Sequence, residues 1–192
     1  MAHTKHVKCV CVGDCAIGKT CMLVSYKSDK FPTEYVPTVV ENYDVDINLE
    51  EGTSVKLHIW DSAGLASYDR VRPLSYINTD VFIVCYSVRS PMSLENVTAK
   101  WLPEIRGRCP KTPFLLVGTH SDVRTDTSEQ DQPRSTLVDP SRAEQVGSRT
   151  GATLVMECSA KTQMGLKDVF VEAAKVGLTG IQRKKHNGCV LL

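Results

Sequence analysis

One glycine-rich segment, residues 13–20, restricts the fold of this chain more than any other feature. Its sequence, GDCAIGKT, fits the pattern G-x-x-x-x-G-K-[ST], and it stands between the β-branched run of residues 7–12 and a helix-like run. In that setting, consecutive backbone N–H groups and the positive N-terminus of the helix surround phosphate groups. The segment therefore predicts a strand–loop–helix unit that binds a nucleoside phosphate.

Two residues of this loop carry the charge and the metal chemistry. Lys19 is expected to reach the β- and γ-phosphates as a point charge, and the hydroxyl of Thr20 is expected to coordinate Mg²⁺. A D-x-x-G element at Asp61 and Gly64 ends a later strand; its acid can support the Mg²⁺ shell, and its glycine lets an N–H approach the γ-phosphate. The other residues expected to contact the ligand here are Gly13, Asp14, Cys15, Ala16, Ile17, Gly18 and Cys21.

Apolar runs alternate with helix-like stretches along the rest of the chain. Ser90-Pro91 and Asp139-Pro140 each provide a helix N-cap followed by a proline at the first helical position. This order predicts an α/β fold with a mostly parallel sheet covered by helices on both faces, and ligands at the carboxyl ends of its strands. Strands are predicted over residues 7–12, 44–49, 55–61, 81–87, 113–118 and 153–157.

The composition is that of an ordinary globular domain. The 192 residues carry a formal net charge of +1, so no overall field attracts nucleic acid, and the length suits one domain.

Residues 125–137 are polar and predict a surface insertion, whereas residues 179–192 lack a helical period and predict a flexible tail. The first twelve residues lack the apolar core of a signal peptide, and the longest apolar run, residues 81–86, is far shorter than the roughly 20 residues that span a bilayer.

The eight cysteines do not resemble a disulfide framework, because several lie inside strand-like apolar runs. Reduced thiols are the better interpretation. Cys9 and Cys11 could be half of a metal site, but no second Cys or His pair at zinc spacing accompanies them. We therefore predict that both side chains lie in the core.

These motifs, together with several further stretches, resemble the Ras superfamily and within it the Rho family. The resemblance covers roughly residues 6–178 and the last four residues. It implies a P-loop NTPase G domain over residues 1–178, with a six-stranded, mostly parallel sheet flanked by helices on both faces. The Rho insert would occupy about 125–137, and 179–192 would form the tail. The stretches that carry the resemblance are residues 31–32 and 34–39 (switch I), 60–64, 68–69 and 72–76 (switch II), and Lys100-Trp101.

The resemblance implies a small GTPase that binds GTP or GDP with Mg²⁺, and it assigns roles to individual residues. Asp122, in the segment Thr119-His120-Ser121-Asp122, would accept hydrogen bonds from guanine N1–H and the N2 amino group, and its unpaired carboxylate would reject adenine. Thr38 would bind Mg²⁺ and the γ-phosphate in the triphosphate state only. The further contacts implied for the nucleotide are Phe31, Tyr35, Thr119, His120, Ser159, Ala160 and Lys161.

Three nucleotide-contacting positions depart from the family pattern. Cys15 stands where the family has glycine, and Leu65 where it has the glutamine that orients the attacking water. Leucine cannot donate or accept a hydrogen bond, and the thiol side chain fills space needed by an arginine finger. We therefore predict slow hydrolysis that is insensitive to GTPase-activating proteins (GAPs), and a mostly GTP-loaded protein. His120 replaces a lysine whose stem covers the base, so we predict weaker nucleotide retention. Neutral drift in an otherwise normal enzyme is the alternative.

Two further positions bear on partners and on redox chemistry. Val40 stands where Rho proteins carry phenylalanine, so effector choice is expected to differ from that of Rac-like relatives, while Glu41 and Tyr43 keep the acidic and aromatic effector positions. Cys21 matches a redox-sensitive thiol of some Rho members; a small buried residue on the first helix is the alternative that we favour.

The last four residues, Cys189-Val190-Leu191-Leu192, match a C-a-a-X box whose terminal leucine favours geranylgeranylation of Cys189. One lipid is marginal for stable anchoring, and the basic run at residues 183–185 adds only a weak second signal. We expect reversible attachment to the cytoplasmic face of the plasma membrane or endomembranes, with extraction from the membrane by a guanine dissociation inhibitor and a cytosolic pool.

Three classes of function follow from the sequence. The first is a GTP-binding signalling switch, a monomer that acts through Rho effectors and exchange factors in actin organisation or membrane traffic. The second is a module that holds nucleotide without cycling, which Cys15, Leu65 and His120 favour. The third, an ATP-dependent P-loop kinase or ATPase, is disfavoured by Asp122.

Overall fold

One sheet organises the part of the chain that the structure, a computed structural model, describes: residues 4–32, 40–49, 52–125 and 136–187. Its six strands run in the order β2-β3-β1-β4-β5-β6. β2 and β3 pair antiparallel, and the other neighbours pair parallel. The predicted six-stranded, mostly parallel α/β fold is therefore confirmed. The strands are β1 (Lys5–Val12), β2 (Val40–Asn48), β3 (Ser54–Ser62), β4 (Val81–Ser87), β5 (Phe114–Thr119) and β6 (Leu154–Glu157).

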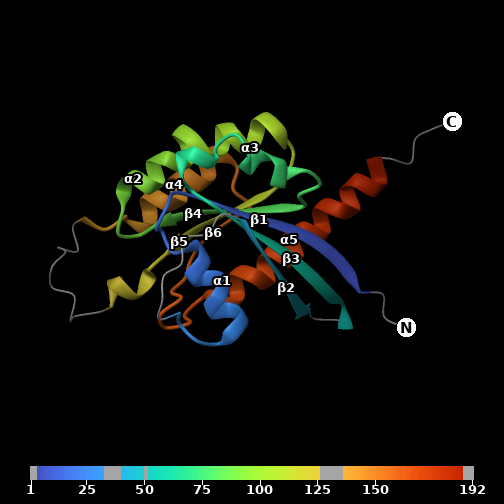
Figure 1. The fold of residues 1–192 in the computed structure, drawn as a ribbon, viewed down its shortest axis with the longest axis horizontal. Helices are drawn as coiled ribbons and strands as arrows, with labels where there is room; N and C mark the ends of the chain where they lie inside the picture. Colours follow the sequence, from blue (N-terminus) through green and yellow to red (C-terminus); the bar gives the residue numbers. More distant parts are fainter. Residues whose placement is uncertain (1–3, 33–39, 50–51, 126–135, 188–192) are drawn as a thin grey trace.

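Helices cover both faces of this sheet (Figure 1). α2, α3 and α4 lie on one face, and α1 and α5 lie on the other. Each face has its own apolar core: Phe170 of α5 packs with residues of β1 and β4, whereas Trp101 and Ile105 pack on the opposite side with Val10 and Val12. The helices are α1 (Lys19–Ser28), α2 (Pro91–Asn96), α3 (Leu102–Arg108), α4 (Pro140–Thr150) and α5 (Leu166–Asn187).

Burial along each strand follows the position of that strand in the sheet. Every residue of the central strand β4 is buried, which agrees with its unbroken apolar run. β3 alternates buried with partly exposed residues, and β1 is exposed at its first two residues, Lys5 and His6. The beginning of β1 and the neighbouring part of β3 therefore leave one face of the sheet open to solvent.

Two helices begin as the sequence predicts. The side chain of Ser90 accepts a hydrogen bond from the backbone N–H of Ser93 at 3.3 Å, and Asp139 accepts one from the N–H of Ser141 at 2.8 Å. α4 ends at Thr150 and is capped by Gly151, whose φ of 75° is the left-handed conformation that glycine tolerates best.

Two boundaries differ from the sequence prediction. α5 continues to Asn187, so the prediction of a tail without helix from residue 179 is wrong for residues 179–187. Ile181 still packs against the core, and the Gln, Arg and Lys residues that follow it are good helix formers that extend a helix already anchored by packing. β2 begins at Val40 rather than at residue 44, because its antiparallel ladder with β3 extends to the pair Val40–Ser62.

Some predicted features lie outside the described residues: most of the polar insertion, residues 126–135, and residues 188–192, which include Cys189. Where the chain is described, no helix has both the length and the apolar character needed to cross a membrane. The cysteines in that part are free thiols, and Cys9 and Cys11 are fully buried in β1, as predicted.

Candidate functional site

The phosphate loop connects the end of β1 to the start of α1, and two glycines are required by its shape. A Cβ added to Gly13 would lie 2.6 Å from the carbonyl oxygen of Cys85, and Gly18 has a φ of 85°. Ala16 also adopts a left-handed conformation, with a φ of 58°. Left-handed residues spaced in this way turn backbone N–H groups toward one concave side, which suits an anion.

Lys19 and Thr20, the first residues of α1, are held by the loop and by β3. Lys19 is 6% exposed, and its Nζ donates to the carbonyl oxygens of Gly13 at 2.9 Å and of Asp14 at 2.6 Å. Burial lowers the pKa of Lys19, because removal from water disfavours its charged form. Phosphate oxygens would give this ammonium charged acceptors in place of neutral carbonyls.

The two residues predicted to support Mg²⁺ are in direct contact. Thr20 Oγ1 donates to Asp61 Oδ2 at 2.5 Å, and Asp61 is fully buried at the end of β3. Hydroxyl and carboxylate oxygens are the hard ligands that Mg²⁺ prefers. The donor set therefore fits a magnesium ion, with Thr20 as the direct ligand and Asp61 behind it.

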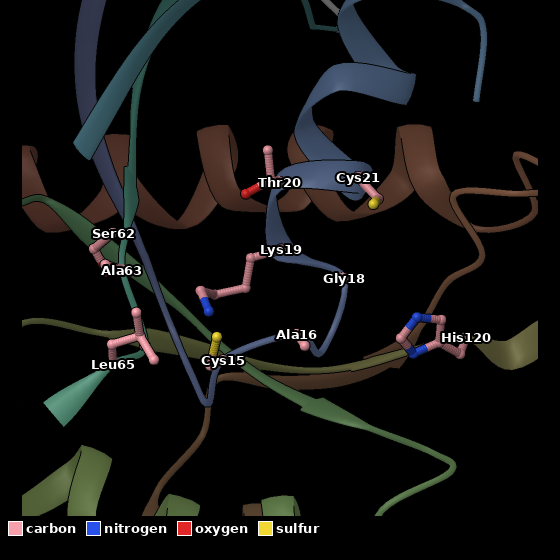
Figure 2. Close-up of a pocket in the computed structure, with 11 residues that line it drawn as sticks. Cys15, Ala16, Gly18, Lys19, Thr20, Cys21, Ser62, Ala63, Leu65 and His120 are labelled. Carbon is pink, nitrogen blue, oxygen red and sulfur yellow. The ribbon is translucent and has the colours of Figure 1, made fainter. Parts of the chain in front are cut away.

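A cavity of about 220 Å³ opens beside the loop, and the residues that line it include Lys19, Thr20, Cys15 and Leu65. Figure 2 shows Cys15 and Leu65 on the side of this cavity where the ammonium of Lys19 lies, with His120 toward the other side. The backbone at Gly64 presses against the loop: a Cβ there would lie 2.5 Å from the backbone nitrogen of Cys15. Glycine alone fits this close approach.

A second cavity, of about 330 Å³, adjoins the first, and both are lined by Gly18, Cys21 and His120. Asp122 lines the second cavity and is 5% exposed; its Oδ1 accepts a hydrogen bond from Ser159 Oγ at 2.6 Å. Ser159 therefore orients the carboxylate through one of its two oxygens. The predicted contacts that also line this cavity are Phe31, Thr119, Ala160 and Lys161.

The end of β5 joins the two cavities. Thr119 Oγ1 donates to the carbonyl oxygen of Ile17 at 2.5 Å, which fastens the phosphate loop to β5. His120 Nδ1 lies 2.9 Å from Ser87 Oγ, and its Nε2 would lie 3.1 Å from a Cβ added to Gly18. The imidazole thus covers the loop at the junction of the cavities.

Comparison with protein families agrees with this geometry. A family model described as the Ras family matches residues 8–178. The chain belongs to the Ras family. It is therefore a small GTP-binding switch with GTPase activity; such proteins bind GTP and GDP, typically with Mg²⁺, and interact with effectors and regulators. Asp122 in one cavity, with Lys19 and Thr20 in the other, fits a guanine base joined to its phosphates.

In this Ras-family site the carboxylate of Asp14 accepts hydrogen bonds from the layer of helices that contains α2 and α3. Asn96 Nδ2 donates to Oδ2 at 2.7 Å, and Trp101 Nε1 donates to Oδ1 at 2.8 Å. Trp101 is placed by a π-helical turn, Val97–Trp101, in which the N–H of Leu102 bonds to the carbonyl of Val97. Because the side chain of Asp14 is engaged in this way, a contact of Asp14 with the nucleotide would come from its backbone.

Arg72 anchors the segment after β3 to the same helix layer. It is 1% exposed; its Nη1 donates to the carbonyl oxygen of Ala63 at 2.8 Å, and its Nε and Nη2 donate to Glu104 at 3.0 and 2.6 Å. Its guanidinium carbon lies 4.6 Å from the ring centroid of Trp101, and the hydroxyl of Tyr76 donates to Glu104 as well. The start of the switch II segment is thus fixed to α3 and to Trp101.

Three predicted nucleotide contacts remain to be placed, and two residues that the sequence did not predict also line the site. Tyr35 and Thr38 lie outside the described residues. Cys21 is half-buried, and burial raises the pKa of its thiol, which favours the packing interpretation over a redox response. Met22 and Arg89 also line the base cavity. Sequence reasoning missed both, because neither belongs to a motif.

Ser159→Ala is expected to accelerate GDP release. The substitution removes the hydroxyl that donates to Asp122, and a hydrogen bond to a charged group is worth about 1.5–3 kcal/mol, which corresponds to a roughly ten- to hundredfold faster off-rate. Release of a fluorescent GDP analogue into excess unlabelled nucleotide measures this rate. Ser148→Ala, on the exposed side of α4, is the matched control. An unchanged rate in Ser159→Ala would contradict the orienting role.

Arg72→Met should lower the free energy of unfolding by about 3–5 kcal/mol, because it leaves the largely buried Glu104 without its ionic partner. The exposed pair Arg142–Glu95 provides a matched control: its side chains are 48% and 52% exposed, and Arg142→Met should cost about 0–1 kcal/mol. Urea unfolding of the GDP-loaded proteins measures both. Equal losses of unfolding free energy in the two variants would show that burial of the Arg72 network adds nothing to stability.

Proposed function

We propose that this Ras-family chain is a Rho-type switch that stays mostly GTP-loaded, because its own hydrolysis is slow and insensitive to GAPs. The observation that carries the proposal is that Cys15 and Leu65 line the same cavity as Lys19 (Figure 2). The binding residues are therefore present beside two side chains that differ from those the family uses to complete hydrolysis.

Hydrolysis needs a water molecule held in line with the γ-phosphate. In the related protein Ras, a glutamine orients this water, and a GAP accelerates GTP hydrolysis roughly 10⁵-fold. We take the size of this rate enhancement from Ras. Leu65 is 42% exposed and offers no donor or acceptor, and Cys15 is exposed at the same cavity, in the space an arginine finger would use. Mg²⁺ would neutralise phosphate charge when bound; Lys19 is placed to hold the phosphates, and Thr20 is placed to hold the ion. Binding is retained while the alignment of water is lost.

Faster nucleotide exchange would add to GTP loading. His120 takes the place of a lysine whose stem covers the base, and its ring is held at Ser87 and beside Gly18. An imidazole is shorter than a lysine stem and covers less of the base. Quicker release then favours GTP, because GTP exceeds GDP in cells.

Support for the Rho type comes from the residues that carry the resemblance. Trp101, from the Rho-like pair Lys100-Trp101, binds Asp14 and stacks against Arg72 of the Rho-like switch II. These residues therefore work as one contact network. We propose that the output runs through Rho effectors and exchange factors, in actin organisation or membrane traffic, and that Val40 alters the choice of effector.

A second candidate function is a non-cycling module that binds nucleotide without turning it over. One observation favours it: the three substituted positions, Cys15, Leu65 and His120, all line the same cavity. The two candidates differ in turnover, because a switch returns to GDP, however slowly, whereas a static module keeps its ligand unchanged.

We also propose that the tail attaches the protein to the cytoplasmic face of the plasma membrane or endomembranes. Cys189 would carry a geranylgeranyl group, with the basic run at residues 183–185 as a weak second signal. A single lipid with so few charges gives reversible binding, so a cytosolic pool and extraction by a guanine dissociation inhibitor are expected.

The hydrolysis proposal is tested by single-turnover GTP hydrolysis with and without a Rho-type GAP. The unsubstituted chain should gain less than about tenfold from the GAP, whereas a double variant, Cys15→Gly with Leu65→Gln, should gain roughly 10³–10⁵-fold. Leu154→Gln changes a similarly exposed leucine on β6 and should behave like the unsubstituted chain. Fast GAP-stimulated hydrolysis by the unsubstituted chain would overturn the proposal. Bound GTP that never decays would favour the non-cycling module.

Cys189→Ser is expected to move the protein from the membrane fraction to the cytosol, because it removes the thiol that a prenyl group would occupy. Fractionation of cells that express each form measures the distribution. Cys109→Ser, at a half-buried cysteine of the folded domain, controls for general effects of losing a thiol. Membrane retention of Cys189→Ser would count against the lipid anchor.

A further inference from the structure

A hydrogen-bonded line of three side chains lies on the open face of the sheet. Asp44 of β2, His58 of β3 and His6 of β1 come from three neighbouring strands. His58 pairs with Asp44 across the antiparallel ladder, and it pairs with Lys8, two residues after His6, across the parallel one. Side chains two residues apart in a strand share a face, so His6 and His58 lie diagonally on the same face. None of the three lines the nucleotide cavities.

The two imidazoles meet edge to edge. His6 Nδ1 lies 2.8 Å from His58 Nε2, and the ring planes differ by 9°. On the other side of the ring, His58 Nδ1 lies 2.7 Å from Asp44 Oδ1. An ionised carboxylate only accepts hydrogen bonds, so in the neutral His58 ring the hydrogen is assigned to Nδ1, and Nε2 then presents its lone pair toward His6.

We propose that His6 and His58 form a two-imidazole site for a divalent transition-metal ion, with Zn²⁺ as the probe, and that Asp44 is its positioning residue. Zinc–nitrogen bonds of about 2.0–2.1 Å in a tetrahedral arrangement place two ligand nitrogens roughly 3.3 Å apart. Opening the 2.8 Å contact slightly, with each ring turned so that its lone pair points at an ion beside the line between the two nitrogens, would admit the ion. His6 shifts its proton from Nδ1 to Nε2 as the ion binds, so that both facing nitrogens offer lone pairs and no proton is lost.

Asp44 completes an arrangement that metal sites use widely. A carboxylate that accepts from the second ring nitrogen of a histidine fixes the tautomer and the orientation of that ring, and it makes the ligating nitrogen more basic. The Asp44–His58 contact of 2.7 Å has this geometry. The aspartate therefore acts through His58, without touching the ion.

Exposure and local charge permit binding. The side chains of His58 and Asp44 are 33% and 59% exposed, so water can complete the coordination. Lys56 Nζ lies 3.6 Å from Asp46 Oδ1, and Lys8 Nζ donates to a backbone carbonyl, so both nearby cations have other partners.

The ligand set also indicates which ions fit. Among the residues the structure describes, no three His, Cys, Asp or Glu side chains are grouped as metal ligands, so this site relies on two imidazoles and open positions for water. Imidazole nitrogen suits zinc, copper and nickel, whereas magnesium and calcium prefer oxygen. The magnesium of the nucleotide site is therefore not expected to compete here.

The test is calorimetric titration of Zn²⁺ into the full chain loaded with GDP and Mg²⁺, in a His3→Gln background that removes the other histidine near the start of the sequence. One Zn²⁺ per chain is expected. His6→Gln and His58→Gln should each weaken binding at least tenfold, and Asp44→Asn about 10- to 100-fold. Zn²⁺ should also raise the melting temperature of the His3→Gln protein but not that of the same protein carrying His58→Gln.

Two controls keep the result interpretable. Asp46→Asn changes the next outward-facing acid of β2, which pairs with Lys56, and should leave the affinity for Zn²⁺ unchanged. Each variant should hold GDP and melt normally without zinc, which shows that it is folded. Unchanged affinity in both His6→Gln and His58→Gln would overturn the site, and unchanged affinity in Asp44→Asn would overturn the positioning role.

Discussion

The phosphate loop keeps its shape because a lysine at its own end and side chains from distant elements bond to it. Lys19 donates to the carbonyls of Gly13 and Asp14, and Thr119 donates to the carbonyl of Ile17. The indole of Trp101 holds the carboxylate of Asp14. Buried polar groups in a loop have no ladder partners, so these bonds supply the partners that regular structure would supply elsewhere. The loop is therefore shaped by the fold, and a phosphate meets N–H groups that already point in one direction.

The Trp101 anchor also reaches the switch II segment, which bears on the proposal that this chain binds nucleotide but hydrolyses it slowly. Trp101 contacts Asp14 on one side and Arg72 on the other, and Arg72 fixes the backbone at Ala63. The frame around the phosphates is thus held independently of residue 65. Under the proposed function, a leucine at that position would leave the grip on the nucleotide intact and would remove only the group that orients water. Loss of hydrolysis without loss of binding is the result expected of such a frame.

Features encoded in short stretches could be predicted from the sequence, and features that depend on distant contacts could not. The loop at residues 13–20 and the helix starts at Ser90 and Asp139 each depend on neighbours within a few residues, and the structure places them as predicted. The bonds from Asn96 and Trp101 to Asp14 span 82 and 87 residues, and no local pattern marks them. The end of α5 was missed for a related reason. Packing at Ile181 anchors the helix, and the polar residues after it extend the helix without an apolar period.

The parallel sheet also explains why one strand can serve two separate sites. The carboxyl end of β1 leads into the phosphate loop, whereas His6 lies near its amino end, about 20 Å away at roughly 3.3 Å per residue. Burial changes along the strand in the same direction, from exposed at Lys5 and His6 to fully buried before the loop. An ion held by His6 and His58 would join β1 to β3 on the sheet face opposite the one that α5 packs against at Val7. Its effect would fall on the stability of the sheet, because the residues that grip the nucleotide are fixed by contacts at the opposite end.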